Sequence, residues 1–352
     1  MIRLRHDNKP VSLNPGDLWA ADSPEPVYRD TSAEELWSIV RQVESGAPWR
    51  DVIDQRYARS NPWLHQVVTS PARDLYFRQH TPHSGSNVID VGAGWGQIAL
   101  PLARNCTVTA LEPTPERLAF IRAAAKQEQL ADRMHFVQAN LFDVDFETSF
   151  DLACCIGVLE WVPKFHAGDP REVQIDFLKR LRALLAPGGR LVIGIENRLG
   201  LKYLMGAPDD HLGVPNVAVY DAALAGRKWQ AQTGAPLRAF TFTRRELVDL
   251  LSSAGLTDHT VFAALPDYKV PQHILPLGPA VDDFFLQGGC IAEHDGSSGR
   301  PLPFQEELHS HYRSLAHLGI ASEFVPSFYV SCQRAGACRA SPARSLQTAE
   351  AV

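Results

Sequence analysis

Short apolar runs alternate with helical patterns along the middle of the chain. Five of these runs have the length of a buried strand, and they lie at residues 88–91, 108–111, 134–137, 152–156 and 190–195. The segments between them place apolar residues at helical spacing, and a further helix is expected to begin at Thr243. Strands that alternate with helices predict βαβ units and a parallel sheet. Two more strands, near 258–265 and 324–332, are expected to close this sheet.

The flanking segments have a different pattern. Residues 1–30 carry Pro and Gly with little periodicity and predict an irregular arm, followed by two or three helices up to residue 80. The first of these helices should place Leu36, Trp37, Val40 and Val43 on its inner face. We therefore predict three parts: an arm with helices over 1–80, a main domain over 81–334 with irregular insertions at 197–240 and 266–322, and a disordered tail over 335–352.

The composition narrows the range of partners. The 352-residue chain has a formal net charge of −6 and no basic block, so nucleic acid is excluded as a partner because its binding needs clustered Lys and Arg. No apolar run approaches the roughly 20 residues of a membrane span. The first residues also lack the apolar stretch of a signal peptide, which favours a cytoplasmic location. The six cysteines show no CxxC spacing, so neither a disulfide framework nor a metal site is expected.

A glycine-rich turn carries the strongest chemical signal. Residues 88–97 (VIDVGAGWGQ) read as a strand, a turn and the start of a helix. Glycines at such a turn let the backbone approach a nucleotide-like ligand. Gly92, Gly94 and Gly96 have the spacing GxGxG, whereas dinucleotide-binding turns have GxGxxG, which disfavours a nicotinamide oxidoreductase. Glu112, at the end of the second predicted strand, could accept hydrogen bonds from both hydroxyls of a ribose.

These residues resemble the class I S-adenosylmethionine-dependent methyltransferase family, over roughly residues 85–265 and the strand near 330. The resemblance implies a Rossmann-like α/β fold: an open, mostly parallel seven-stranded sheet with an N-terminal helical extension and inserted cap segments. It also implies S-adenosylmethionine as the cofactor. The positions that match cofactor-binding positions of the family are Asp90, Gly92, Ala93, Gly94, Gly96, Glu112, Pro113, Asn140, Leu141, Ile156 and Gly157. Asn140 stands where the family usually has Asp, and its carbonyl oxygen could still accept a hydrogen bond from the adenine amine.

A narrower resemblance involves four further segments. The stretches 158–161 (VLEW), 195–203 (IENRLGLKY), 206–211 (GAPDDH) and 266–269 (PDYK) resemble a subgroup of methyltransferases encoded with bacterial surface-polysaccharide genes. Because function commonly lies in loops added to a rigid scaffold, we expect residues 1–80 and the two insertions to form a lid and pocket for the methyl acceptor. The expected acceptor-binding residues are Trp161, Glu196, Asn197, Arg198 and Tyr203. Alternatively, residues 197–198 only cap a strand and residues 209–210 only form a surface turn.

Transfer of a methyl group to a hydroxyl needs a base within hydrogen-bond reach. His211 is the best candidate, because an imidazole titrates near neutrality. Asp210 would orient it, Glu160 is the second candidate, and activity should then rise through a pKa near 6.5. The expected partner is a small-molecule acceptor: a sugar, a polysaccharide precursor or a secondary metabolite. Methylation at nitrogen or carbon, a protein that binds the cofactor without methylating, and assembly as a homodimer stay open as alternatives.

Overall fold

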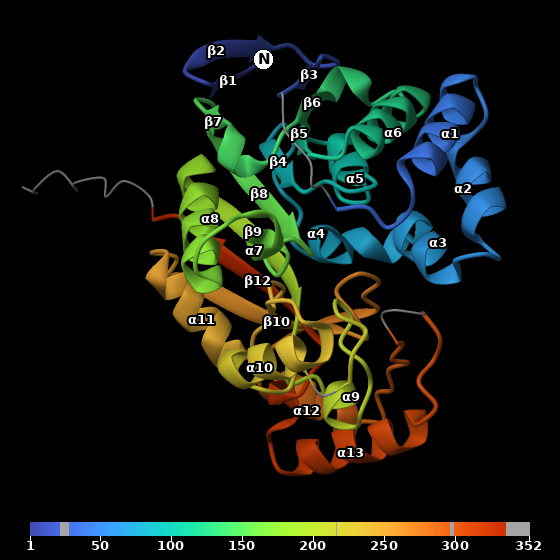
Figure 1. The fold of residues 1–352 in the computed structure, drawn as a ribbon, viewed down its shortest axis with the longest axis vertical. Helices are drawn as coiled ribbons and strands as arrows, with labels where there is room; N and C mark the ends of the chain where they lie inside the picture. Colours follow the sequence, from blue (N-terminus) through green and yellow to red (C-terminus); the bar gives the residue numbers. More distant parts are fainter. Residues whose placement is uncertain (22–27, 216, 296–298, 336–352) are drawn as a thin grey trace, which may run out of the picture.

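The computed structural model describes residues 1–21, 28–215, 217–295 and 299–335. Its centre is a nine-stranded sheet with the order β11-β10-β12-β9-β8-β4-β5-β6-β3 (Figure 1). The strands of this sheet are β3 (Leu18–Ala20), β4 (Asn87–Val91), β5 (Thr107–Leu111), β6 (Met134–Gln138), β8 (Phe150–Ile156), β9 (Leu185–Glu196), β10 (His259–Leu265), β11 (His273–Pro276) and β12 (Ser327–Gln333). From β9 to β3 all neighbours are parallel, whereas β12 is antiparallel to both β9 and β10. The expected Rossmann-like, mostly parallel α/β fold is confirmed.

The sheet has two more strands than the predicted seven, one at each edge. At one edge β3 pairs with β6, and at the other β11 pairs with β10. The prediction that residues 1–30 are irregular was wrong, because β1 (Ile2–His6) and β2 (Lys9–Leu13) form a hairpin that also pairs with β7 (Asp145–Phe146). Asp7 and Asn8 occupy the turn with φ of 49° and 61°, the conformation that two-residue hairpin turns favour.

Two hydrophobic cores lie on opposite faces of the sheet, because successive strand residues point to opposite sides. Ile89 packs in one core and Val88 in the other, and the adjacent Cys154 and Cys155 divide in the same way. Helices from the N-terminal half cover one face: α1 (Ala33–Glu44), α2 (Trp49–Tyr57), α3 (Pro62–Thr69), α4 (Leu75–Gln79), α5 (Ala99–Ala103) and α6 (Pro115–Gln127). The other core includes residues of α8 (Pro170–Leu184), α11 (Arg244–Ser253), α12 (Pro279–Leu286) and α13 (Gln305–His317).

The two insertions contain regular structure that the sequence pattern did not predict. The 197–240 segment contains α9 (Leu201–Leu204) and α10 (Ala222–Thr233), and the 266–322 segment contains β11, α12 and α13. Helix α10 begins at an Asp221 cap and ends at Gly234 with φ of 71°, both of which are common helix boundaries. Its only buried residue is Ala225, so it lacks the apolar stripe by which helices are detected in a sequence. None of the described helices is long and apolar enough to cross a membrane.

The inner face of α1 differs from the prediction at one position. Ser32 caps the helix by accepting a hydrogen bond from the Glu35 amide, and Leu36 is 1% exposed. Trp37, however, is 37% exposed, and Ile39 takes a buried place instead. Trp37 follows Leu36 by one residue, and a rotation of about 100° per residue turns it away from the contact with α6.

These two neighbours give a direct test of how the N-terminal helices are held. Leu36→Ala should lower the free energy of unfolding by about 2–5 kcal/mol, because it leaves a cavity between α1 and α6. Trp37→Ala should cost about 1 kcal/mol or less. Urea unfolding of both variants measures the difference. Equal losses would mean that α1 does not pack as described.

Candidate active site

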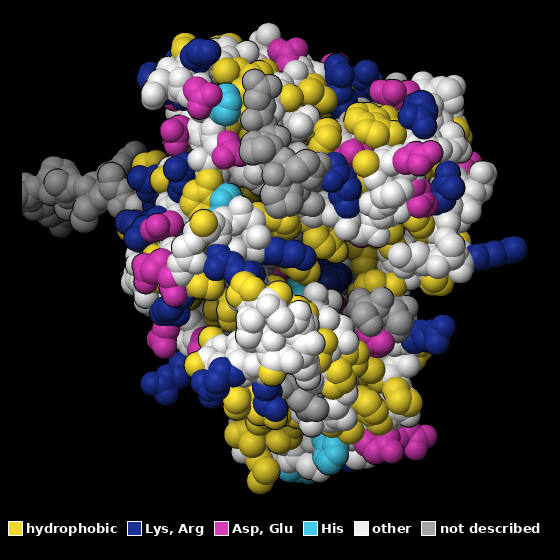
Figure 2. All heavy atoms as spheres, in the orientation of Figure 1, with side chains coloured by type: hydrophobic (Ala, Val, Ile, Leu, Met, Phe, Trp, Pro, Cys, Tyr) yellow, Lys and Arg dark blue, Asp and Glu magenta, His cyan; other side chains and the backbone are white. Residues whose placement is uncertain are grey.

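A cavity of about 480 Å³ opens where the parallel strands β4, β5 and β8 end. Ligands of open α/β sheets bind at this edge, and the volume is in the range of small-molecule sites. Every residue that the sequence placed at the cofactor lines this cavity, except Gly96. A Cβ on Gly96 would instead lie 3.1 Å from Ile121 of α6, so this glycine serves close packing of the turn. Figure 2 shows that the surface is hollowed near the middle of the face drawn there.

The glycine turn is fastened to the end of β5 by Glu112. Gly92 and Gly94 have φ of 72° and 57°, and a Cβ on Gly92 would lie 2.5 Å from Val158 Cγ2. The Gly94 amide donates to Glu112 Oε2 at 2.8 Å, and the Thr114 amide donates to Oε1 at 3.0 Å. Each carboxylate oxygen has a second lone pair that could accept a hydrogen bond from a ligand hydroxyl.

Several residues that line the cavity carry a buried polar atom with no hydrogen-bond partner in the protein. These atoms are Asp30 Oδ1, Arg73 Nε and Nη1, Asp90 Oδ2 and Arg117 Nε. Burial raises the pKa of Asp90 to about 7. Buried polar atoms are normally paired, so this set indicates a cavity built for a polar ligand.

Comparison with known proteins agrees with this geometry. Residues 89–193 match a family model described as "Methyltransferase domain". This segment is a methyltransferase domain. The "Ubiquinone biosynthesis O-methyltransferase" of Coxiella burnetii is 30% identical over 142 residues, which are 40% of this chain and 56% of that protein. The mitochondrial protein of the same name from Schizosaccharomyces pombe is 29% identical over 131 residues, which are 37% and 44%.

The matched region spans about half the length of these curated relatives. Among solved structures, the CcbJ methyltransferase of Streptomyces caelestis is similar, with 16% identity, 76% of this chain and 90% of that chain covered, and a TM-score of 0.43. The cofactor of the methyltransferase domain is S-adenosylmethionine. Its ribose hydroxyls suit Glu112, and its polar groups suit the unpaired atoms of the cavity, so the residues present fit this cofactor.

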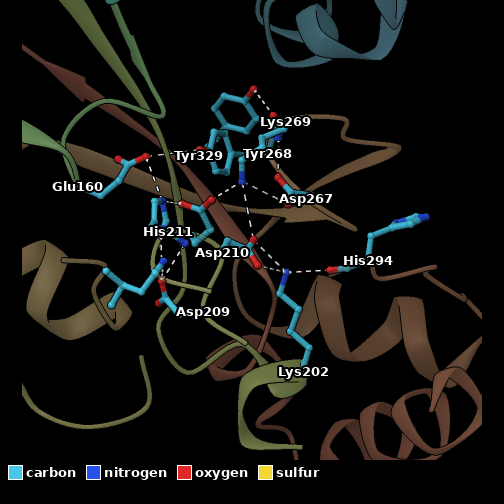
Figure 3. A network of polar contacts seen from close by, with 12 residues as sticks. Glu160, Lys202, Asp209, Asp210, His211, Asp267, Tyr268, Lys269, His294 and Tyr329 are labelled. Atoms are coloured by element: carbon cyan, nitrogen blue, oxygen red, sulfur yellow. Dashed lines mark hydrogen bonds and ion pairs between the residues drawn. The ribbon is translucent and has the colours of Figure 1, made fainter. Parts of the chain in front are cut away.

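His211 lies at the end of the cavity, enclosed by carboxylates (Figure 3). Its Nε2 atom is 3.3 Å from Glu196 Oε2 and 3.6 Å from Glu160 Oε1. Glu196 is the last residue of β9, and Glu160 follows β8, so two neighbouring strands deliver both acids to one point. The Trp161 ring packs edge-on at 5.0 Å from the imidazole. This arrangement can hold a proton on His211 or take one from a neighbouring group.

Asp209, not Asp210, lies beside the imidazole, which corrects the prediction from the sequence. Asp209 Oδ1 accepts hydrogen bonds from the His211 and Leu212 amides and lies 3.7 Å from His211 Nδ1. Asp210 points away and pairs with Lys202 Nζ at 2.9 and 3.0 Å. The two side chains diverge because adjacent residues in a tight turn point in different directions.

The carboxylates change the protonation of His211. Burial alone would lower its pKa, but Glu196, Asp209 and Glu160 outweigh burial and raise the pKa well above the ordinary value. Burial raises the pKa of Glu160. Burial would raise the pKa of Glu196 too, but His211 and Lys269 hold it well below its usual range. The carboxylates therefore favour the protonated form of His211, and we expect its pKa to lie above the ordinary imidazole value.

The same side chains are a donor set that could hold a metal ion. The ligand atoms of Glu160, Glu196 and His211 all lie within 4.8 Å of one another, and carboxylate and imidazole donors suit several divalent metals. In this structure Glu196 also pairs with the Lys269 ammonium. The charge of the cluster is thus partly balanced by protein groups.

The residues expected at the acceptor separate into three groups. Trp161 and Glu196 line the cavity, and Arg198 lines a second cavity. Asn197 is buried and caps the end of β9, with its amide group donating to the Glu323 and Val325 carbonyls. Tyr203 is also buried and lines neither cavity. These hydrogen bonds favour the alternative in which Asn197 caps the strand.

Sequence reasoning missed several polar residues of the site. Lys269 contacts Glu196, Asp267 and Asp210, and the Tyr268 hydroxyl lies 3.5 Å from Glu160 Oε1. Both belong to the stretch 266–269, which resembles the subgroup of methyltransferases but carries no sequence signal for a specific role. Arg73 carries no comparable signal, because it lies in a short helical turn between α3 and α4.

Cofactor binding should depend on the turn and its carboxylate. Glu112→Ala removes an acceptor of charge-assisted hydrogen bonds, worth about 1.5–3 kcal/mol, and Gly94→Ala strains a backbone with positive φ. Both should weaken S-adenosylhomocysteine binding in calorimetry about ten- to a hundredfold. Glu34→Ala, on the exposed side of α1, is the control. Unchanged affinity in both site variants, or heat with nicotinamide dinucleotides, would contradict the assignment.

Proposed function

We propose that this protein is an S-adenosylmethionine-dependent methyltransferase that methylates a hydroxyl of a small molecule. The observation that carries the proposal is the His211 imidazole, held between Glu160 and Glu196 at the end of the cofactor cavity. The relatives named as O-methyltransferases support oxygen as the acceptor atom. Tyr28, Asp30, Trp63 and Leu64 line the same cavity, which supports residues 1–80 as a lid over the site.

The reaction divides between the cofactor and the chain. When bound, the cofactor would supply an electrophilic methyl group, with the bonding electron pair left on its sulfur as the acceptor oxygen gains the new carbon–oxygen bond. The chain holds the acceptor in line, excludes water and removes the hydroxyl proton. Neutral His211 accepts that proton at Nε2, and Glu196 and Glu160 stabilise the resulting cation. Glu160 lines neither cavity, so it is a positioning residue.

Two alternatives follow from the same site. A neutral amine acceptor needs no base, so methylation of nitrogen would proceed without His211. A sugar or polysaccharide precursor is the acceptor that the resemblance of residues 195–211 suggests. Product analysis distinguishes methylation of nitrogen from methylation of oxygen. The lining of the second cavity, described in the next subsection, bears on whether the acceptor is a sugar.

Replacing His211 tests its role as the base. His211→Ala should lower turnover by about 10²–10⁴, the usual contribution of general-base assistance. Affinity for S-adenosylhomocysteine should stay within about twofold, because Glu112 and the glycine turn bind it. His317→Ala, on the exposed end of α13, is the matched control. Full activity of His211→Ala would exclude a histidine base.

The pH dependence tests the carboxylates. Only neutral His211 can accept a proton, so turnover should rise with pH through a pKa well above 6.5. Glu196→Gln removes the carboxylate that contributes most to raising this pKa, and should move the rise to lower pH with the same acceptor. A rise near pH 6.5 in the unaltered protein, or no movement in Glu196→Gln, would contradict this arrangement.

A further inference from the structure

A second cavity of about 370 Å³ lies behind His211. It is enclosed by the start of α8, by α10 and by residues 237–242, and half of its lining residues are Ala, Val, Leu or Phe. Ala218, Ala225 and Phe240 are examples. His211 lines both this cavity and the cofactor cavity. The Phe240 amide donates to the Glu160 carbonyl at 3.1 Å, which fixes this wall next to the base.

Most polar side chains of the second cavity are already paired within the protein. Arg198 donates to both Glu246 oxygens at 2.6 and 2.8 Å and to the Val219 carbonyl at 3.0 Å. Gln174 donates to the Leu159 carbonyl at 3.0 Å. Asp169 accepts hydrogen bonds from two amides at the start of α8. These groups have little capacity left for a ligand.

The two cavities therefore differ in what they can bind. The residues that line the cofactor cavity include Asp30, Arg73, Asp90 and Arg117, each with an unpaired buried polar atom. In the described part of the chain, no unpaired buried side-chain nitrogen or oxygen lines the second cavity. A ligand with many hydroxyls would lose more hydrogen bonds to water there than the side chains of Arg171, Tyr220 and Thr241 could replace. An apolar ligand would lose none.

We propose that the second cavity binds the apolar body of the methyl acceptor, with a single hydroxyl directed at His211. The acceptor is then a lipophilic alcohol or phenol rather than a sugar. This inference rests on the proposed function, because it takes His211 as the group that meets the hydroxyl. Small side chains on α10 and at Ala218 leave the space that the apolar body occupies.

Binding of 1-naphthol and of methyl glucoside to the full chain, saturated with S-adenosylhomocysteine, tests the proposal by calorimetry. Ala225→Leu and Ala218→Leu fill the cavity from two different segments. Ala231→Leu places the same side chain on an exposed position of α10 and is the matched control. Affinity for S-adenosylhomocysteine reports whether each variant is folded.

We expect naphthol to bind and methyl glucoside not to bind at the same concentration. Each filling variant should weaken naphthol binding at least about tenfold, with the control within about twofold. Absence of naphthol binding, unchanged affinity in both filling variants, or tighter binding of the glucoside would overturn the proposal. If the unaltered protein does not bind S-adenosylhomocysteine, the proposed function fails. In that case, a loss of naphthol binding in the two filling variants would still support an apolar cavity.

Discussion

The placement of one imidazole between two buried carboxylates constrains the rest of this structure. Glu160 and Glu196 are almost fully buried, and their nearest carboxylate oxygens lie within 4.8 Å of each other. Two buried acids this close need cations nearby, because an uncompensated buried charge is very costly. His211 and Lys269 provide them. The loops that follow β8, β9 and β10 must therefore meet at one place, whatever the acceptor.

A second buried pair extends this network. Lys202, on α9, pairs with Asp210. Burial alone would lower the pKa of Lys202, but Asp210 and other nearby carboxylates raise it. The pair holds the loop that carries His211 against the short helix after β9. The insertion at 197–240 is thus held by the Lys202–Asp210 ion pair near its start. Apolar contacts among Val217, Ala225 and Leu237 hold the segment around α10. The parallel strands place the glycine turn and the acids at the same edge, so the cofactor and the base share one cavity.

The sequence predicted those parts of the molecule that local patterns determine. The central strands and helix α11, capped by Thr243, follow from apolar periodicity and capping, and the turn at 92–96 follows from its glycines. The network could not be predicted, because its members are far apart in the chain and meet only through the sheet. Asp209 and Asp210 illustrate this limit: the sequence suggested Asp210 as the partner of His211, and the geometry of one turn brings Asp209 there instead. Helix α10 was missed because its buried contact is a single alanine.

The protonation state of His211 tests most directly whether Glu160 and Glu196 enclose its imidazole. A ¹⁵N NMR titration of histidine-labelled protein, with His211 assigned by comparison with His211→Ala, reports the charge of the imidazole at each pH. We expect an imidazolium at pH 7 that loses its proton well above pH 6.5. A neutral imidazole at pH 7 would mean that the carboxylates of Glu160 and Glu196 do not enclose it.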